Sequence, residues 1–414
     1  MRGVANRVRD AAAGQEPQFE QLAVPEGYQR TDVGVIPYDW EAVSLSKTAE
    51  RVTRGASPRP IDSPVWFDEK SSVGWVRISD VTRSGRFLSD TTQKLSEAGI
   101  RKSRPVPAGS LIMSICATVG RPIETRIDTC IHDGFVVFQQ PKVEQSFLYY
   151  LLVGLEPTWS KHGQTGSQMN LNTGLINNCL VPLPNSTAEQ RAIAQALSDV
   201  DELLNALEVL IAKKRAIKQA AMQQLLTGRT RLPGFSGEWE TRRLGDVLTV
   251  CHGRSQREVE IPHGPYPILA TGGQIGTTDR PLYDKPSVLI GRKGTVDQPQ
   301  YMETPFWTVD TLFYCAMKSS HVARFFYYRF WLIDWHRYNE ASGVPSLNAK
   351  TIENIEVVCP NPSEQATIAS VLADMDAEIT ALERRRDKTL AIKEGMMQQL
   401  LTGRVRLVDR EAVE

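Results

Sequence analysis

One phrase occurs twice in this chain, and the duplication restricts its fold more than any other feature. The phrase "QQLLTGRTRL" occupies residues 223–232, and "QQLLTGRVRL" occupies residues 398–407. Extended backwards, residues 189–232 align without a gap onto residues 364–407, with 24 identities in 44 positions. This agreement indicates an internal duplication. Long stretches of unlike sequence separate the copies, so the pattern is not that of a solenoid, whose repeats follow one another directly.

Each copy predicts one long helix. Each begins with a capping residue three positions before a glutamate, a pattern typical of helix N-termini. The pairs are Ser186 with Glu189 and Asn361 with Glu364, and Pro362 suits the first helical position. Gly228 and Gly403 follow the last apolar residues, where a left-handed residue commonly ends a helix. Each helix would run roughly 40 residues, or about 60 Å at 1.5 Å per residue.

The apolar residues of both helices follow the alternating four-and-three spacing of a coiled-coil seam. The seam residues are Ile193, Leu197, Val200, Leu204, Leu207 and Ile211 in the first copy, and Ile368, Leu372, Met375, Ile379 and Leu382 in the second. A seam needs a partner, so we predict that the two copies pair as an antiparallel coiled coil within a pseudo-twofold internal repeat. Separate packing of each helix on its own domain is the alternative. The next seam position of the second copy is Arg386, which marks either a splayed end of the coil or a docking point for another subunit.

The two segments between the helices match each other only at their edges. Each opens with an acidic residue and a tryptophan, Trp40 or Trp239, and a glycine follows later, Gly55 or Gly253. Their closing stretches, "QMNLNTGLINNCLVPLP" and "VPSLNAKTIENIEVVCP", are also alike. Short β-rich runs such as "SLIMSI" and "SVLIG" alternate with turns and a few helical stretches, which predicts mixed α/β domains. A shared frame with different contents indicates one fold used to recognise two different things.

The expected fold class is therefore α/β (α+β), with two mixed domains joined by two long helices. The predicted boundaries are an N-terminal tail at 1–33, a first domain at 34–185, a first helix at 186–228, a second domain at 229–360, a second helix at 361–404 and a C-terminal tail at 405–414.

Composition excludes several classes of protein. The formal net charge is zero, so there is no overall basic field, although phosphate binding requires only a local basic surface. None of the six cysteines is spaced as C-x-x-C, which gives no support for a zinc site. No apolar run approaches the ~20 residues of a membrane span, and the N-terminus lacks the apolar core of a signal peptide. We expect a cytoplasmic protein without a membrane partner.

Together these features resemble the specificity (S) subunit of type I restriction-modification systems. The resemblance rests on the "EQ…MQQLLTGR" helices, on "IPYDW" at 36–40 and "FSGEWE" at 235–240, and on "YPILATGGQIG" at 266–276 and "YDKPSVLIGRKG" at 283–294. It implies that each domain is a target recognition domain for one half of a gapped sequence in double-stranded DNA. It also implies that the helices set the separation of the half-sites and dock two modification (methyltransferase) subunits, and that restriction subunits then join.

The resemblance further implies a subunit without a catalytic centre, in a bacterial defence system whose partners use S-adenosylmethionine, ATP and Mg²⁺. The residues agree, because the chain contains no G-x-G-x-x-G, Walker A or H-E-x-x-H motif. No catalytic residue and no metal ligand is therefore predicted.

Polar and basic side chains in loops are the expected DNA contacts. In the first domain, residues 76–104 carry a local basic surplus, and residues 161–170 form a polar, glycine-rich stretch. The candidates there are Arg77, Arg83, Arg86, Arg101, Lys102, Arg104, Gln164, Ser167, Gln168 and Asn170. In the second domain, "ATGGQIG", "GRKG" and the segment before residue 348 supply Gln274, Arg292, Lys293, Ser346 and Asn348.

A standalone nuclease or methyltransferase is a further interpretation, and the missing catalytic motifs argue against it. Two other interpretations stay open at this point. The chain could be a protein–protein scaffold without a DNA role, which its neutral net charge permits. It could also be a specificity module that serves a different effector. Steeply salt-dependent DNA binding would separate the first of these from DNA recognition.

Overall fold

The computed structural model describes residues 24–162 and 171–408, and its contacts divide the chain into two compact units. Unit 1 comprises residues 1–203 and 389–414, and unit 2 comprises residues 204–388. The two long helices are α5 (Thr187–Leu225) and α9 (Pro362–Leu400), each of 39 residues. Each unit therefore contains one α/β domain together with one end of α5 and one end of α9.

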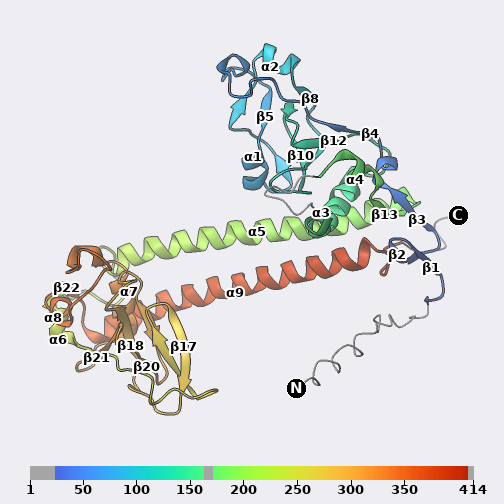
Figure 1. The fold of residues 1–414 in the computed structure, drawn as a ribbon. Helices are drawn as coiled ribbons and strands as arrows, with labels where there is room; N and C mark the ends of the chain where they lie inside the picture. The colour runs from blue at the N-terminus through green and yellow to red at the C-terminus, as the bar shows by residue number, and fades with distance from the viewer. Residues whose placement is uncertain (1–23, 163–170, 409–414) are drawn as a thin grey trace, which may run out of the picture. The chain divides into compact units, whose positions relative to one another are not determined.

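The α/β domain of unit 1 contains two main sheets (Figure 1). The larger sheet has the order β4-β12-β9-β10-β6, and the smaller has the order β7-β5-β11-β8. Two short antiparallel pairs, β1–β2 and β3–β13, complete the strands. The strands are β1 (Tyr28–Thr31), β2 (Gly34–Pro37), β3 (Trp40–Ser44), β4 (Ala49–Arg54), β5 (Gly74–Val76), β6 (Phe87–Leu88), β7 (Gln93–Lys94), β8 (Arg104–Val106), β9 (Leu111–Ser114), β10 (Pro122–Thr125), β11 (Thr129–Ile131), β12 (Phe135–Pro141) and β13 (Leu180–Pro184).

Short helices connect these strands, and one longer helix packs on the helix pair. They are η1 (Leu45–Lys47), η2 (Pro64–Trp66), α1 (Ile78–Arg83), α2 (Glu97–Arg101), α3 (Gln145–His162) and α4 (Thr173–Asn178). Aromatic and leucine side chains of α3 share one hydrophobic core with Ile193 and Leu197 of α5 and with Leu400 of α9. This core fixes the first domain to its ends of the two long helices.

The α/β domain of unit 2 also has two main sheets, and each has fewer strands than its counterpart in unit 1. Its sheets have the orders β15-β21-β18-β19 and β17-β16-β20, and β14 pairs with β22. The elements are β14 (Glu240–Arg243), α6 (Leu244–Val247), β15 (Leu248–Cys251), β16 (Tyr266–Ala270), β17 (Gly273–Thr278), β18 (Ser287–Gly291), β19 (Gln300–Met302), β20 (Trp307–Thr308), β21 (Leu312–Met317), α7 (Ala323–Phe330), η3 (Trp335–Tyr338), α8 (Ala349–Glu353) and β22 (Glu356–Cys359). Four aromatic side chains of α7 are buried and pack with Ile368 and Leu372 of α9: Phe325, Phe326, Tyr328 and Phe330.

The two domains share one topology. In the larger sheet of unit 1, β12 lies between β4 and β9. In the larger sheet of unit 2, β21 lies between β15 and β18. All four pairings are antiparallel, and β12 and β21 each precede the helix that packs on α5 and α9. Each smaller sheet contains one parallel pair, β5 with β11 or β16 with β20. This confirms the prediction of one fold used twice.

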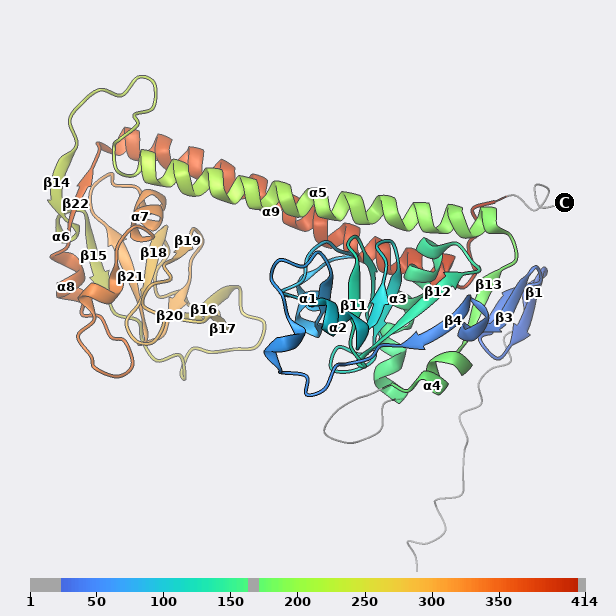
Figure 2. The ribbon, with the colours of Figure 1, turned by 90° about the horizontal axis from the view of Figure 1, so that it is seen from above.

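The helices α5 and α9 run antiparallel in each unit (Figure 2). In unit 1, Asp201 of α5 pairs with Lys393 near the end of α9. In unit 2, Lys218 near the end of α5 pairs with Asp376 of α9. The predicted seam is the contact face: Ile193, Leu197, Leu207, Ile211, Ile368, Leu372 and Ile379 are buried, and Val200, Leu204, Met375 and Leu382 are partly buried. Arg386 is partly buried, pairs with Asp387 and lies inside α9.

The predicted caps are present at both helices. The backbone N–H of Glu189 donates to Ser186 Oγ over 3.5 Å, and that of Glu364 donates to Asn361 Oδ1 over 3.0 Å. Gly228 and Gly403 adopt φ values of +72° and +69° after the last helical residues, the left-handed conformation that favours glycine.

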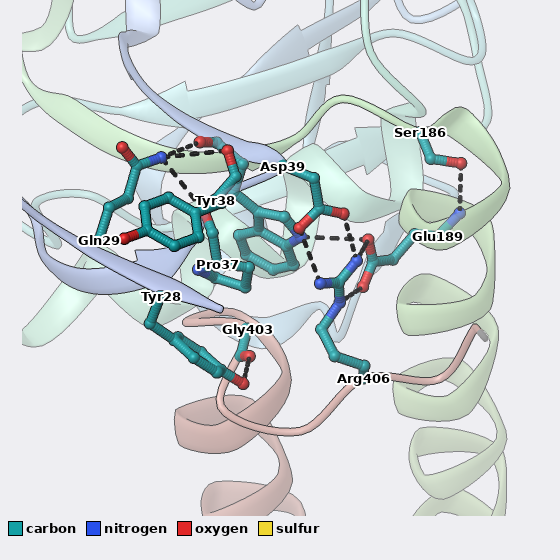
Figure 3. Close-up of polar contacts among 10 residues, drawn as sticks. Tyr28, Gln29, Pro37, Tyr38, Asp39, Ser186, Glu189, Gly403 and Arg406 are labelled. Carbon is teal, nitrogen blue, oxygen red and sulfur yellow. Dashed lines mark hydrogen bonds and ion pairs between the residues drawn. The ribbon is translucent and has the colours of Figure 1, made fainter. Parts of the chain in front are cut away.

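In a capping box, the glutamate carboxylate accepts a hydrogen bond from the backbone N–H of the capping residue. Glu189 and Glu364 bind other partners. In unit 1 the Glu189 carboxylate, only 1% exposed, accepts a hydrogen bond from Trp40 Nε1 over 3.1 Å and pairs with Arg406 (Figure 3). In unit 2 the equivalent Glu364 accepts from Trp239 Nε1 over 3.3 Å and pairs with Arg231. An arginine that follows one helix thus closes the start of the other helix within the same unit. We call these two sites the glutamate joints.

A second contact of the same kind repeats in both units. The Tyr150 hydroxyl donates to Asp201 Oδ2 over 2.8 Å, and the Tyr328 hydroxyl donates to Asp376 Oδ2 over 2.7 Å. Burial, reinforced by the neighbouring aspartate, raises the pKa of both tyrosines, so each hydroxyl stays protonated and remains a donor. Each domain is thereby bonded to an aspartate that also pairs with a lysine of the opposite helix.

The predicted tails at 1–33 and 405–414 are wrong where they adjoin the rest of the chain, because residues there form a strand and ion pairs. Residues 28–31 form β1, which pairs with β2, and the Tyr28 hydroxyl donates to the backbone oxygen of Gly403 over 3.0 Å. Arg406 is held by Asp39 and Glu189. Pairing across the sequence orders these residues, and composition alone does not reveal it. No helix in the described ranges is long and apolar enough to cross a membrane.

Candidate nucleic-acid interface

A glycine at the same place in both domains forces two loops into close contact. Gly55 follows β4, and a Cβ atom on it would lie 2.1 Å from the backbone oxygen of His132. Gly253 lies after β15, and a Cβ atom there would lie 2.0 Å from the backbone oxygen of Val309. No side chain fits such distances, so only glycine permits this approach. We call the segments 55–59 and 253–257 the glycine loops.

Each glycine loop is bonded to the segment before β12 or β21. The backbone N–H of Ala56 donates to Ile131 O over 3.1 Å, and that of Arg254 donates to Thr308 O over 2.8 Å. The starts of the two loops are therefore held in the same way in both domains.

In unit 2 three turns gather beside this segment. The Arg292 backbone N–H donates to Thr311 O over 2.8 Å, and Arg292 O accepts from Leu347 N over 2.9 Å. Lys293 forms a bridge with Ser346. A Cβ atom on Gly291 would lie 3.2 Å from Thr271, so the β16–β17 turn is the third neighbour. The structure thus brings Arg292, Lys293 and Ser346 together, although they were separate candidates in the sequence.

These candidates differ in how free their side chains are. Lys293 and Gln274 are exposed, while Arg292 is half-buried and donates from Nη1 to Asp310 O over 3.3 Å. Asn348 is the N-cap of α8, because its Oδ1 accepts from Lys350 N over 2.9 Å. Its side-chain oxygen is therefore already occupied, as is that of Asn172, the equivalent cap of α4.

Arg86 is a correction among the DNA candidates of the first domain. Its side chain is 11% exposed, pairs with Glu124, and donates to Tyr150, Ser146 and Ser198. A guanidinium whose donors are all directed into the protein is not free for DNA. Counting charges along the sequence cannot reveal this, because Glu124 lies 38 positions away.

The other basic candidates of the first domain fall into separate groups. Arg77 donates to Gln93, and Arg83 donates to Thr92 and pairs with the buried Asp80. Arg101 pairs with Glu97 at the exposed surface of α2, and Lys102 is exposed beside it. Arg104 Nε donates to Arg54 O over 2.7 Å, which places it at the glycine loop. Gln164, Ser167, Gln168 and Asn170 lie outside the described residues.

The glycine loops also contain basic residues that the sequence analysis missed. Arg54 precedes the first loop and Arg59 belongs to it, and Arg254 and Arg257 belong to the second. Arg59 is exposed at 83% of its side-chain surface and lies 3.7 Å from Asp133. A usable signal was present, because both loops read Gly-x-Ser-x-Arg, at 55–59 and 253–257.

Asp133 organises the first glycine loop. Ser57 Oγ donates to Asp133 Oδ1 over 2.8 Å, and the backbone N–H of Asp133 donates back to Ser57 Oγ over 3.3 Å. Partial burial opposes ionisation, but the Ser57 hydrogen bond and the neighbouring His132 and Arg54 outweigh it and lower the pKa of this carboxyl. Asp133 therefore stays charged and holds the loop in one conformation.

Within the described ranges, no group of three or more His, Cys, Asp or Glu side chains could hold a metal ion. The candidate groups are arginines, lysines and polar side chains, and those of the second domain gather on neighbouring turns. Such groups bind phosphate and base edges.

Comparison with known proteins identifies the family. The model of the type I restriction modification DNA specificity domain matches residues 37–219 and again residues 236–391. The chain belongs to this family.

This specificity subunit has relatives along its whole length. The putative type I restriction enzyme MjaX specificity subunit of Methanocaldococcus jannaschii is 24% identical over 94% of this chain and 98% of its own. The S subunit of the type I restriction-modification system of M. genitalium has a similar fold, with a TM-score of 0.63 at 14% identity over 92% of this chain and 98% of its own. A structure described for complex assembly and conformational transition of the type I R-M system gives a TM-score of 0.57 at 17% identity, over 89% and 99% of the two chains.

The two matches of the family model place one specificity domain in each half of the chain. As a member of this family, the protein is the DNA-specificity part of a type I restriction-modification system, which is a recognition role and not a catalytic one.

Proposed function

We propose that this specificity subunit recognises a gapped, two-part DNA sequence, with one half read by each α/β domain. One observation carries the proposal. The two domains share strand order, a glycine loop and the contacts to the helix pair, yet the side chains on the turns differ between them. For example, Arg292 and Lys293 occupy a turn whose counterpart in the first domain carries Ile115 and Cys116. One frame with different contents would read two different half-sites.

The proposal includes the partners of the subunit. We infer that α5 and α9 act as the spacer between the half-sites and dock two methyltransferase subunits, and that restriction subunits join this complex. The related structure described for complex assembly of the type I R-M system supports this inference. S-adenosylmethionine, ATP and Mg²⁺ would then be bound by the partners and not by this chain.

The decisive experiment is a genome-wide map of adenine methylation in cells with and without the gene. We expect a gapped two-part motif that disappears on deletion and returns when the gene is restored. If the methyltransferase subunit is present and no motif depends on this gene, the proposal is wrong. A scaffold without a DNA role would also give no salt-dependent DNA binding.

A mutation tests the turns of the second domain. We expect replacement of Arg292 and Lys293 by alanine to weaken DNA binding and to reduce the slope of log K against log salt by about 0.9 for each phosphate that is no longer bound. A salt titration with the full chain measures this slope. The matched control is alanine at Arg242 and Arg243, an exposed basic pair in β14 of the same domain. A slope equal to that of the wild type would remove Arg292 and Lys293 from the phosphate-binding residues.

A further inference from the structure

The glycine loops carry one pattern of polar residues that recurs in both domains. Their sequences are Gly55-Ala56-Ser57-Pro58-Arg59 and Gly253-Arg254-Ser255-Gln256-Arg257, so glycine, serine and arginine recur at the same spacing. The neighbouring turns share no such pattern. A contact that is identical in both domains cannot distinguish two different half-sites, so its ligand is a group that both half-sites contain.

The geometry leaves the arginine as the group available to a ligand. Gly55 and Gly253 are closed against the neighbouring backbone. In the first loop Ser57 is already engaged with Asp133. Arg59, by contrast, extends its side chain into solvent, and Arg257 is exposed at the matching position.

The existing partner of Arg59 does not prevent it from binding a ligand. The Arg59–Asp133 pair is 3.7 Å long, and the Asp133 side chain is itself 44% exposed. Surface pairs of this kind contribute little, about 0–1 kcal/mol, so an incoming anion can replace the carboxylate. The guanidinium presents a fork of N–H donors that matches two oxygens of a phosphate.

We propose that the two glycine loops are equivalent phosphate-binding loops, in which Arg59 and Arg257 grip the DNA backbone at each half-site independently of base sequence. This inference rests on the proposed function. Phosphate contacts fix the register and orientation of a protein on the duplex without reading its sequence. The glycine loops would set each domain on the DNA, and the divergent turns would then read the bases.

The test uses the full chain with Arg59→Ala, Arg257→Ala and the double variant. We expect the double variant to reduce the salt slope by about 1.8, which is two phosphates at about 0.9 each. Its affinity should fall about tenfold, and by the same factor for the recognised duplex and for an unrelated duplex of equal length. Lysine at both positions should retain most of the slope, because the charge is kept. The methylated motif in cells should keep the same bases.

The matched control is alanine at Arg191 and Arg384, which are exposed arginines on α5 and α9. This double variant removes the same charge as the Arg59/Arg257 double variant. Equal slopes for the wild type and the Arg59/Arg257 double variant would overturn the inference while leaving DNA recognition intact. A decrease in affinity confined to the recognised duplex would also overturn it, since that result indicates base reading. Absence of salt-dependent binding by the wild type would instead overturn the proposed function, and with it this inference. Thermal melting of each variant confirms that it is folded.

Discussion

Replacement of Arg406 by alanine is expected to lower the free energy of unfolding of unit 1 by about 3 kcal/mol. The variant removes the cation that faces Glu189, a carboxylate that is only 1% exposed. Trp40 Nε1 still donates one hydrogen bond, but a buried charge remains without a counter-charge. Breaking a buried ion pair by removal of one partner is far more damaging than the loss of a surface pair. Chemical denaturation, followed by the fluorescence of the tryptophans, measures the change.

Two further variants separate the joint from general effects of the C-terminal segment. Arg404→Ala removes an exposed arginine two residues away and should change stability by less than about 0.5 kcal/mol. Glu189→Gln combined with Arg406→Ala should recover part of the stability, because no buried charge is then left unpaired. Full stability of Arg406→Ala alone would mean that water replaces the guanidinium and that the joint does not hold the unit.

Insertion of one heptad into both long helices is expected to change the recognised DNA sequence itself. Seven residues after Leu204 in α5, and seven after the equivalent Ile379 in α9, keep the seam continuous and add about 10 Å at 1.5 Å per residue. The spacer role proposed for these helices then predicts a gap longer by about three base pairs, at 34–36 Å per helical turn of DNA. The bases of both half-sites should stay the same. A map of adenine methylation in cells measures the gap directly.

The controls for this insertion concern the site and the pairing of the helices. Seven glycine and serine residues inserted at Gly237, an exposed loop position between α5 and β14, should leave the gap unchanged. An insertion in α5 alone should disturb the seam and weaken methylation, because the partner helix has no matching heptad. Active methylation with an unaltered gap in the matched variant would show that the helices are not the spacer.

The long helices could be predicted from the sequence because their determinants are local. Caps at Ser186 and Asn361, the seam and the terminal glycines all lie within a few residues of the features they explain. The side-chain partners could not be predicted, since they come from distant parts of the chain. Glu189 has the position of one half of a capping box, yet its carboxylate binds Arg406, which is 217 positions away.

The candidate DNA-binding residues show the same division. Lys293 and Ser346 were each named from the sequence, but their bridge could not be predicted, because it joins two turns that are 53 positions apart. Arg86 could not be excluded, since its ion pair with Glu124 forms only when β6 and β10 meet. The glycine loops were missed for a different reason. Their shared pattern is short, and its meaning depends on the close backbone contacts of Gly55 and Gly253.

The composition of unit 1 has a consequence for the order in which the chain can fold during synthesis. Unit 2 is a continuous stretch, residues 204–388, whereas unit 1 also requires residues 389–414. A ribosome adding about 5–20 residues per second would need roughly 10 to 40 s to proceed from the end of the first segment of unit 1 to its second. During that interval Glu189 and Asp201 lack their partners Arg406 and Lys393, which have not yet been synthesised. Unit 2 can already fold, although it is made later. The domain made first is thus completed last, and a ribosome that stops shortly before residue 406 would release a chain whose first half is unfinished.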